Sequence, residues 1–119
     1  MIYKETILNV ADNSGAKKVK CFNMGSRNGD ARVGHKIRVS VRRAEPNANV
    51  KEGEVHYAVI VRTKSMIYRK NGLKWRSGDN AVVLVDAKGK MLGTRVLGCV
   101  ARESGATDSA ITSRALKVY

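Results

Sequence analysis

The sequence predicts a mainly β protein, namely a small closed β-barrel with a projecting β-ribbon and a short helical C-terminus. Short apolar runs that alternate with polar residues recur along the chain, and eleven glycines separate them. The 119 residues, 43% of them hydrophobic, suffice for one domain over residues 1–119 with a modest core. Five or six strands in about 100 residues fit a small barrel.

The first two predicted strands are separated by turn-forming residues. Residues 6–10 are a short apolar segment that ends at the cluster Asp12-Asn13-Ser14-Gly15. Residues 18–21 then alternate, whereas Phe22 and Met24 fall on the opposite parity. This change predicts a bulge, or the end of regular pairing, near Phe22. A loop is expected over residues 25–30.

The clearest strand signal lies at residues 37–42, where apolar residues alternate with Arg38, Ser40 and Arg42. The alternation predicts one face toward a core and a basic face toward solvent. A longer strand is expected over residues 55–63, with the apolar side chains at 55, 57, 59 and 61 on one side.

Residues 66–76 predict a β-ribbon. The pair Asn71-Gly72 lies between two short alternating runs and is the pair that a type I′ hairpin turn requires. A two-residue loop sets Tyr68 opposite Trp75 on one face and Arg69 opposite Lys74 on the other. Like charges directly opposite each other destabilise a free ribbon, and phosphate groups would relieve that repulsion. The ribbon is therefore predicted to bind nucleic acid.

Two strands and a helix complete the predicted fold. Residues 81–85 are a continuous apolar run typical of a buried strand, and a turn follows over residues 86–90. Residues 95–100 close the β-rich part. Asp108 or Ser109 is a candidate cap for a helix over residues 108–117, with Ile111, Ala115 and Leu116 on its apolar side.

The basic charge is large and unevenly distributed. The formal net charge is +13, and residues 1–76 contain 17 Lys or Arg against 6 Asp or Glu. The segment 62–76 contains six basic residues and no acidic one. Concentrated like charge destabilises a compact domain by self-repulsion unless a polyanion neutralises it. Solubility alone needs much less charge, so nucleic acid is the predicted partner class.

The sequence shows no motif for catalysis, and we predict no enzyme activity, no cofactor and no membrane partner. A zinc site built from Cys21, Cys99, His35 and His56 would lack the closely spaced ligand pairs of such sites, although a metal-dependent enzyme that uses these residues stays an alternative. The two cysteines are predicted to be reduced and packed in the core, with a disulfide as the alternative. No apolar run approaches the roughly 20 residues that cross a membrane.

The composition also narrows the kind of RNA recognition. Aromatic residues make up only 5% of the chain, which is poor for a single-strand stacking platform. Recognition of the backbone and shape of folded RNA, by loops and a ribbon, fits better. A free-standing basic β-barrel RNA chaperone has the same features and is the alternative function.

Several separated blocks carry a family resemblance. They are residues 8–18 (LNVADNSGAKK), 50–55 (VKEGEV), 58–64 (AVIVRTK), 80–84 (NAVVL), 93–96 (GTRV) and 100–103 (VARE). In this order and spacing they closely resemble the universal large-subunit ribosomal protein fourteen family, in its bacterial and organellar form. The resemblance extends from residue 1 to residue 119.

The resemblance implies a five-stranded barrel with a β-ribbon and short C-terminal helices, without catalysis. It implies binding to large-subunit rRNA, a position beside ribosomal protein nineteen, bridges to small-subunit rRNA and docking of a ribosome-silencing factor. Motif by motif, it implies rRNA contacts from Asn13, Ser14, Lys17, Lys18, Arg62, Lys64, Arg69 and Arg76, to which the ribbon adds Lys70 and Lys74. The subunit-interface and factor-docking residues would be Thr94 and Arg95, with Arg114 from the C-terminal segment.

Four departures from the family pattern are visible. Ser77 stands where Phe or Tyr is expected, Cys99 replaces a Pro, His35 follows Gly34 where an acidic residue is common, and residues 111–119 lack the usual Pro. They concern silencing-factor docking and the bridge contacts rather than the fold. They favour an organelle ribosome, namely a mitochondrial one, over a ribosome of the bacterial cytoplasm. Because the N-terminus does not resemble a transit peptide, an organelle protein of this kind is expected to be encoded in the organelle.

Overall fold

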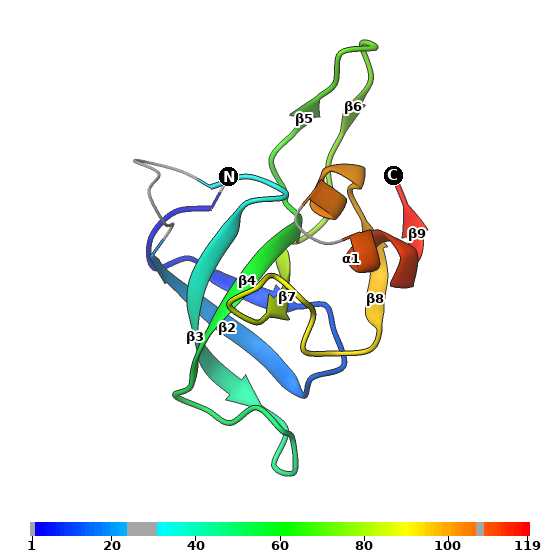
Figure 1. Ribbon diagram of the computed structural model, residues 1–119. Helices are drawn as coiled ribbons and strands as arrows, with labels where there is room; N and C mark the ends of the chain where they lie inside the picture. Colours follow the sequence, from blue (N-terminus) through cyan, green and yellow to red (C-terminus); the bar gives the residue numbers. More distant parts are fainter. Residues whose placement is uncertain (1, 24–30, 107–108) are drawn as a thin grey trace.

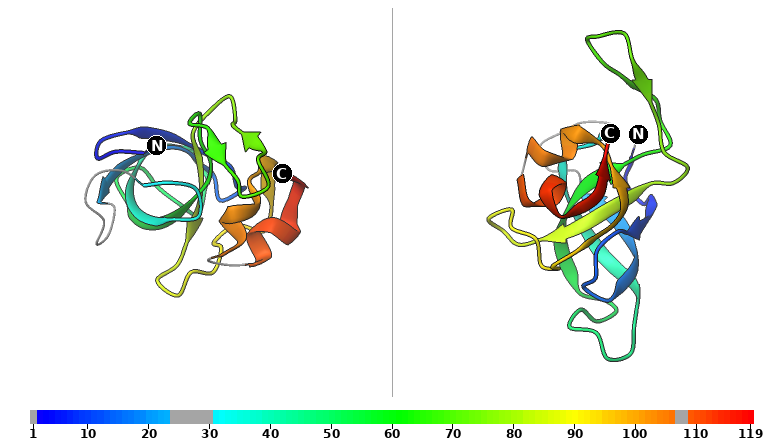
Figure 2. Two further views of the ribbon diagram at one scale, coloured as in Figure 1. Left: turned by 90° about the horizontal axis from the view of Figure 1, so that it is seen from above. Right: turned by 90° about the vertical axis from the view of Figure 1, so that its right-hand side faces the viewer.

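The computed structural model describes residues 2–23, 31–106 and 109–119, and its centre is a closed five-stranded β-barrel (Figure 1). The strand order around the barrel is β1-β2-β3-β4-β7. All neighbours are antiparallel except β1 and β7, which close the barrel as a parallel pair. The barrel strands are β1 (Ile7–Val10), β2 (Ala16–Asn23), β3 (Lys36–Ala44), β4 (Val55–Arg62) and β7 (Ala81–Val85). The predicted fold class is confirmed, and Figure 2 shows the ring of strands from above.

The barrel interior is filled by the apolar residues of the alternating strands. On β3, Ile37, Val39 and Val41 are at most 2% exposed, whereas Arg38 and Arg42 point outward as predicted. Each such aliphatic side chain stabilises the fold by about 1.5–3 kcal/mol on full burial. The pairing of β2 with β3 shifts register between residues 21 and 23, which confirms the irregularity predicted near Phe22.

Strand β7 is buried along its whole length because both of its faces are covered. Val82 and Leu84 belong to the barrel core, whereas Val83 and Val85 belong to a second cluster. That second cluster contains Val96, Val100 and Ile111 from the C-terminal third of the chain. The continuous apolar run at residues 81–85 is explained by this double coverage, since neither face of the strand meets water.

The ribbon formed by β5 (Ile67–Tyr68) and β6 (Lys74–Trp75) projects from one end of the barrel (Figures 1 and 2). The predicted pairing in the ribbon is wrong by one residue. Tyr68 pairs with Lys74 and Ile67 with Trp75, because the loop has three residues rather than two. The Arg69 amide donates to the Leu73 carbonyl at 3.0 Å.

The third loop residue, Gly72, explains the longer loop. Its amide donates to the Arg69 carbonyl at 3.1 Å and closes a turn over residues 69–72. Its φ is +85°, so the turn ends in a glycine of left-handed conformation. Consequently Arg69 does not lie opposite Lys74, and the like-charge pairing predicted for the ribbon is wrong. Lys74 instead lies over the Tyr68 ring, with its ammonium 5.6 Å from the ring centre.

The C-terminal third forms a small layer beside the barrel. It contains β8 (Val96–Val100), a 3₁₀ helix η1 (Arg102–Ala106), the helix α1 (Ser109–Arg114) and β9 (Ala115–Val118). The prediction of a helix extending to residue 117 is wrong, because the chain leaves the helix at Arg114 and pairs in parallel with β8. Ile111 is fully buried as expected, but Leu116 lies on a strand and is 87% exposed.

The remaining predictions concern the cysteines, two segments near residues 25–30 and 108, membrane spans and metal sites. Both cysteines are free. Cys21 is buried in the barrel core as predicted, and burial raises the pKa of its thiol. The core packing predicted for Cys99 is wrong, because this residue is only half-buried. The predicted loop at 25–30 and the cap candidate Asp108 lie outside the described residues. Within the described ranges, no helix has the length and apolarity to span a bilayer, and no three His, Cys, Asp or Glu groups gather as metal ligands would.

Candidate nucleic-acid interface

The turn between β1 and β2 is organised by a buried carboxylate. Asp12 is 4% exposed, and its Oδ2 accepts the backbone N–H of Leu84 at 2.9 Å. Its Oδ1 accepts both the amide and the hydroxyl of Ser14, at 3.1 and 2.6 Å. These charge-assisted bonds attach the turn to β7 and satisfy a buried donor that would otherwise be unpaired. The Ser14 hydroxyl, a predicted rRNA contact, is therefore used inside the protein.

Asn13 joins this turn to the segment before β8. Its Nδ2 donates to the Thr94 hydroxyl at 2.8 Å, and its Oδ1 accepts the amides of Thr94 and Arg95 at 2.8 and 3.1 Å. Gly93 permits this approach, because a Cβ there would lie 2.7 Å from the Asn13 Oδ1. A predicted rRNA residue and two predicted interface residues thus form one structural unit.

The third predicted interface residue belongs to the same neighbourhood. The Arg114 Nη1 donates to the Gly93 carbonyl at 3.2 Å. Arg95 and Arg114 line a cavity of about 330 Å³ together with Leu97 and Leu116, which are 52% and 87% exposed. The structure therefore brings Thr94, Arg95 and Arg114 together beside an exposed apolar surface.

Arg62 is held by partners within the protein. Its Nε and Nη2 donate to the Asp79 carboxylate at 2.8 and 3.3 Å, and its Nη1 donates to the carbonyls of Leu97 and Cys99 at 3.1 and 3.0 Å. The hydrogen bond from Arg62 is the main cause that lowers the pKa of Asp79, against the opposing effect of burial. The guanidinium thereby connects β4, β8 and the segment before β7.

Arg69 orients the ribbon. It forms an ion pair with Glu103 at 2.9 Å, and its Nη1 donates to the Tyr119 carbonyl. On the same ribbon, Trp75 stacks on Tyr119 with ring centres 5.9 Å apart. Three contacts therefore tie the ribbon to the C-terminal layer, and the Arg69 charge is compensated by a carboxylate.

The other predicted rRNA residues fall into two groups. Lys17 and Lys18 are exposed and, with Asn13 and Arg62, line a groove of about 670 Å³ between the β1–β2 turn and β8. At the base of the ribbon, Lys64 and Arg76 line a second cavity of about 360 Å³. The exposed residues Lys70 and Lys74 lie along the ribbon itself.

Strands β2 and β3 present a basic surface of which sequence reasoning assigned only Lys18 to the site. We call this surface the basic barrel face, and it consists of Lys18, Lys20, Lys36, Arg38, Arg42 and Arg43. The five barrel strands contain eight Lys or Arg and no Asp or Glu. The alternation at residues 37–42 could have revealed the face, since it already put Arg38 and Arg42 on one side.

Two like charges lie directly opposite each other on the basic barrel face. Lys18 of β2 is the cross-strand partner of Arg43 of β3, at a register shift that leaves both residues exposed. Neither forms an ion pair with any residue that the structure describes. The unfavourable pairing predicted for the ribbon is thus found in the barrel, and an anion would relieve it.

A second charge concentration lies on the same face. The Lys36 ammonium and the Arg38 guanidinium lie 4.5 and 4.6 Å from the centre of the Tyr57 ring. The Nε of Arg38 is buried without a hydrogen-bond partner in the described part of the chain. The Tyr57 ring partly stabilises the two cations, because its face attracts positive charge.

A closed barrel that carries an unbalanced basic face and a basic ribbon is typical of small β proteins whose partners are polyanions. The family model described as "Ribosomal protein L14p/L23e" matches residues 1–119, and the chain belongs to this family. It is accordingly a structural protein of the large ribosomal subunit, located in the ribosome, with ribosomal RNA and proteins as its partners, and its family is structural rather than enzymatic.

Proposed function

We propose that this protein, as one domain over residues 1–119, binds large-subunit rRNA chiefly through the basic barrel face. The observation that carries the proposal is the opposition of Lys18 and Arg43 without carboxylate partners in the described structure. Phosphate groups placed between two such cations convert a repulsion into two attractions. Lys17, Lys64, Lys70, Lys74 and Arg76 are exposed and extend the proposed contact surface to the groove and the ribbon.

Four of the sequence-predicted rRNA residues already have partners inside the protein. Asn13 and Ser14 stabilise the β1–β2 turn, and Arg62 and Arg69 pair with carboxylates. Their contacts with rRNA stay a proposal. The internal bonds favour an indirect role for them, in which these residues hold the loops and the ribbon that present the exposed cations.

We further propose that the β8–β9 side meets other components of the ribosome. Thr94, Arg95 and Arg114 would contact small-subunit rRNA in intersubunit bridges. The exposed leucines Leu97 and Leu116 would contact protein neighbours, which include ribosomal protein nineteen and a ribosome-silencing factor. Exposed apolar side chains beside arginines are typical of protein interfaces, which supports this division of the surface.

The salt dependence of RNA binding tests the basic barrel face. In the variant with Lys18→Gln and Arg43→Gln, the slope of log affinity against log salt should fall by about 1.4–1.8, because each lost phosphate contact removes about 0.7–0.9. The control carries Lys88→Gln and Lys90→Gln, which remove the same charge from the exposed turn after β7. An unchanged slope in the first variant, or an equal fall in both, contradicts the proposal.

Sedimentation separates this function from the alternative RNA chaperone. A structural rRNA-binding protein stays with large subunits at moderate salt, whereas a chaperone would bind many RNAs with strong salt dependence and would not be enriched in ribosomes. The same fractionation of cells and organelles tests the proposed mitochondrial location. Recovery only with cytoplasmic ribosomes of a bacterium would contradict that location.

A further inference from the structure

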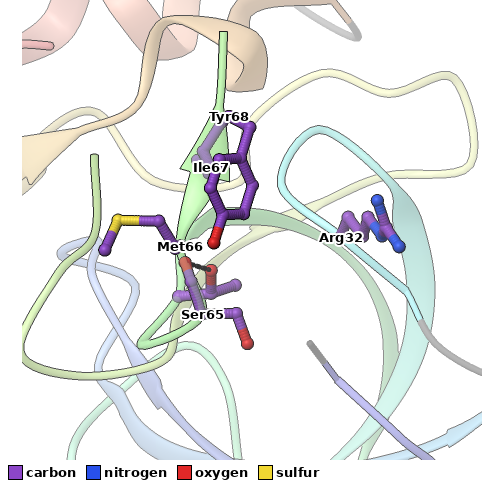
Figure 3. Close-up of a pocket in the computed structure, with 6 residues that line it drawn as sticks. Arg32, Ser65, Met66, Ile67 and Tyr68 are labelled. Carbon is purple, nitrogen blue, oxygen red and sulfur yellow. Dashed lines mark hydrogen bonds between the residues drawn. The ribbon is translucent and has the colours of Figure 1, made fainter. Parts of the chain in front are cut away.

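A cavity of about 290 Å³ opens at the base of the ribbon (Figure 3). It lies between the start of β5 and the loop before β3, and Thr63, Ser65, Met66, Ile67, Tyr68 and Arg32 line it. In Figure 3, the Tyr68 side chain lies on one side of the cavity and the Arg32 side chain lies on the other. The turn below them is closed by the Thr63 hydroxyl, which donates to the Ser65 carbonyl at 3.2 Å.

The aromatic ring at this cavity is unusually accessible. Tyr68 is 73% exposed, more than any other tyrosine described, and the neighbouring Met66 is 39% exposed. Its hydroxyl and ring therefore stay in water although the ring has a large apolar area to bury. The Lys74 ammonium lies 5.6 Å from the ring centre. A ligand with a flat apolar face would gain contact area here.

The charge around the cavity selects among such ligands. Lys64, Lys74 and Arg76 are exposed close to it along the chain, and residues 62–76 contain no acidic residue. A polyanion is attracted to this region, whereas a neutral or basic peptide gains nothing from the field. The volume, about 290 Å³, lies just below the range of about 300–1,000 Å³ for ligand cavities, and suits one ring system rather than a peptide helix.

We infer that this cavity receives one unstacked nucleobase of the bound RNA. The base stacks on Tyr68, the Arg32 guanidinium offers a second flat surface across the cavity, and Lys64 and Lys74 meet the flanking phosphates. The inference rests on the proposed rRNA binding and adds a specific site to it. A single aromatic at a concave site accommodates one base, which is consistent with a chain too poor in aromatics to form a stacking platform.

The test uses the full chain and the rRNA fragments that it protects from nuclease. Tyr68→Ala should weaken the affinity about 5- to 150-fold, the range expected for loss of one stacked base. Tyr68→Phe keeps the ring and should stay within about threefold of the wild type. The control is Leu73→Ala, which removes another exposed apolar residue of the ribbon, 60% exposed, that does not line the cavity. Thermal unfolding of each variant verifies that the fold is intact.

Two further readouts distinguish stacking from charge effects and from other occupants. The salt slope should be unchanged in Tyr68→Ala, because stacking releases no counterions. An abasic nucleotide at the protected position should weaken the wild type and leave Tyr68→Ala unaffected. If the wild type binds rRNA and Tyr68→Ala binds equally well, the nucleobase site is refuted while the proposed function stands. If Tyr68→Ala binds naked rRNA normally but fails to enter the subunit, the occupant is a protein segment and the inference is overturned. Failure of the wild type to bind rRNA refutes the proposed function itself.

Discussion

Arg62 offers the sharpest test of whether a basic residue predicted to contact rRNA stabilises the fold or binds RNA. We expect Arg62→Gln to lower the free energy of unfolding and to leave the salt slope of RNA binding unchanged. The variant loses two bonds to Asp79 and two to the carbonyls of Leu97 and Cys99. A bond to a charged group contributes about 1.5–3 kcal/mol net, but the Asp79 side chain is 35% exposed, so water replaces part of the loss.

These considerations give a destabilisation of about 2 kcal/mol. For a chain of this size it lowers the unfolding midpoint by about 8 °C. Lys64→Gln is the matched control, because it removes the same charge from an exposed residue two positions later. We expect its unfolding free energy to stay within about 0.5 kcal/mol of the wild type. Thermal and urea unfolding of both variants supply the measurement.

The pH dependence of unfolding gives an independent check on the same ion pair. The pKa of Asp79 is lowered in the folded state, chiefly by its hydrogen bond from Arg62, from an ordinary value of 3.8. The pair therefore contributes stability above about pH 4, and this contribution is lost as the pH falls through the folded pKa. The wild type should therefore lose more stability than Arg62→Gln as the pH falls below about 4. An unchanged midpoint together with a smaller salt slope would refute the structural role and assign Arg62 to RNA.

Two further predictions concern the C-terminal layer. Asn13→Ala should destabilise the protein by about 1–2 kcal/mol. It should also speed hydrogen exchange of the Thr94 and Arg95 amides, since both lose their acceptor. Exchange no faster than in the wild type would contradict this prediction. Replacing Leu97 and Leu116 by Ser should leave rRNA affinity within about twofold, because exposed leucines contribute little to the fold. It should weaken retention of protein neighbours on purified subunits, because these leucines form the proposed apolar contact. Undiminished retention would place the protein contacts elsewhere.

The elements were predictable where local chemistry sufficed. Alternation at residues 37–42 and the apolar run at 81–85 correctly indicated a half-buried and a fully buried strand. The ribbon was correctly located by Asn71-Gly72, but its register was not, because the same pair also fits a three-residue loop with a left-handed glycine. The predicted C-terminal helix is too long, because β9 pairs with β8, whose residues lie 18 or 19 positions earlier in the chain, and helix periodicity does not reveal that pairing.

The candidate site was likewise predictable only in part from the sequence. Basic residues are visible in any sequence, but their partners are not, since Asp79 and Glu103 lie 17 and 34 residues from the arginines they bind. The sequence therefore predicted an rRNA contact equally for Arg62, Arg69 and Lys18. Distances and burial now separate the arginines that stabilise the fold from the cations that have no carboxylate partner in the described structure.

By itself, the sequence determined the fold class, the excess of positive charge and the family, because composition, period-two alternation and motif spacing are local properties of the chain. The tertiary structure alone decided where the charge is uncompensated. Barrel closure sets β2 beside β3 and Lys18 opposite Arg43, and folding of the C-terminal layer supplies Glu103 to Arg69. Electrostatic repulsion and neutralisation depend on the distance between charges in space, and that distance is fixed only when the strands pair and the layers pack.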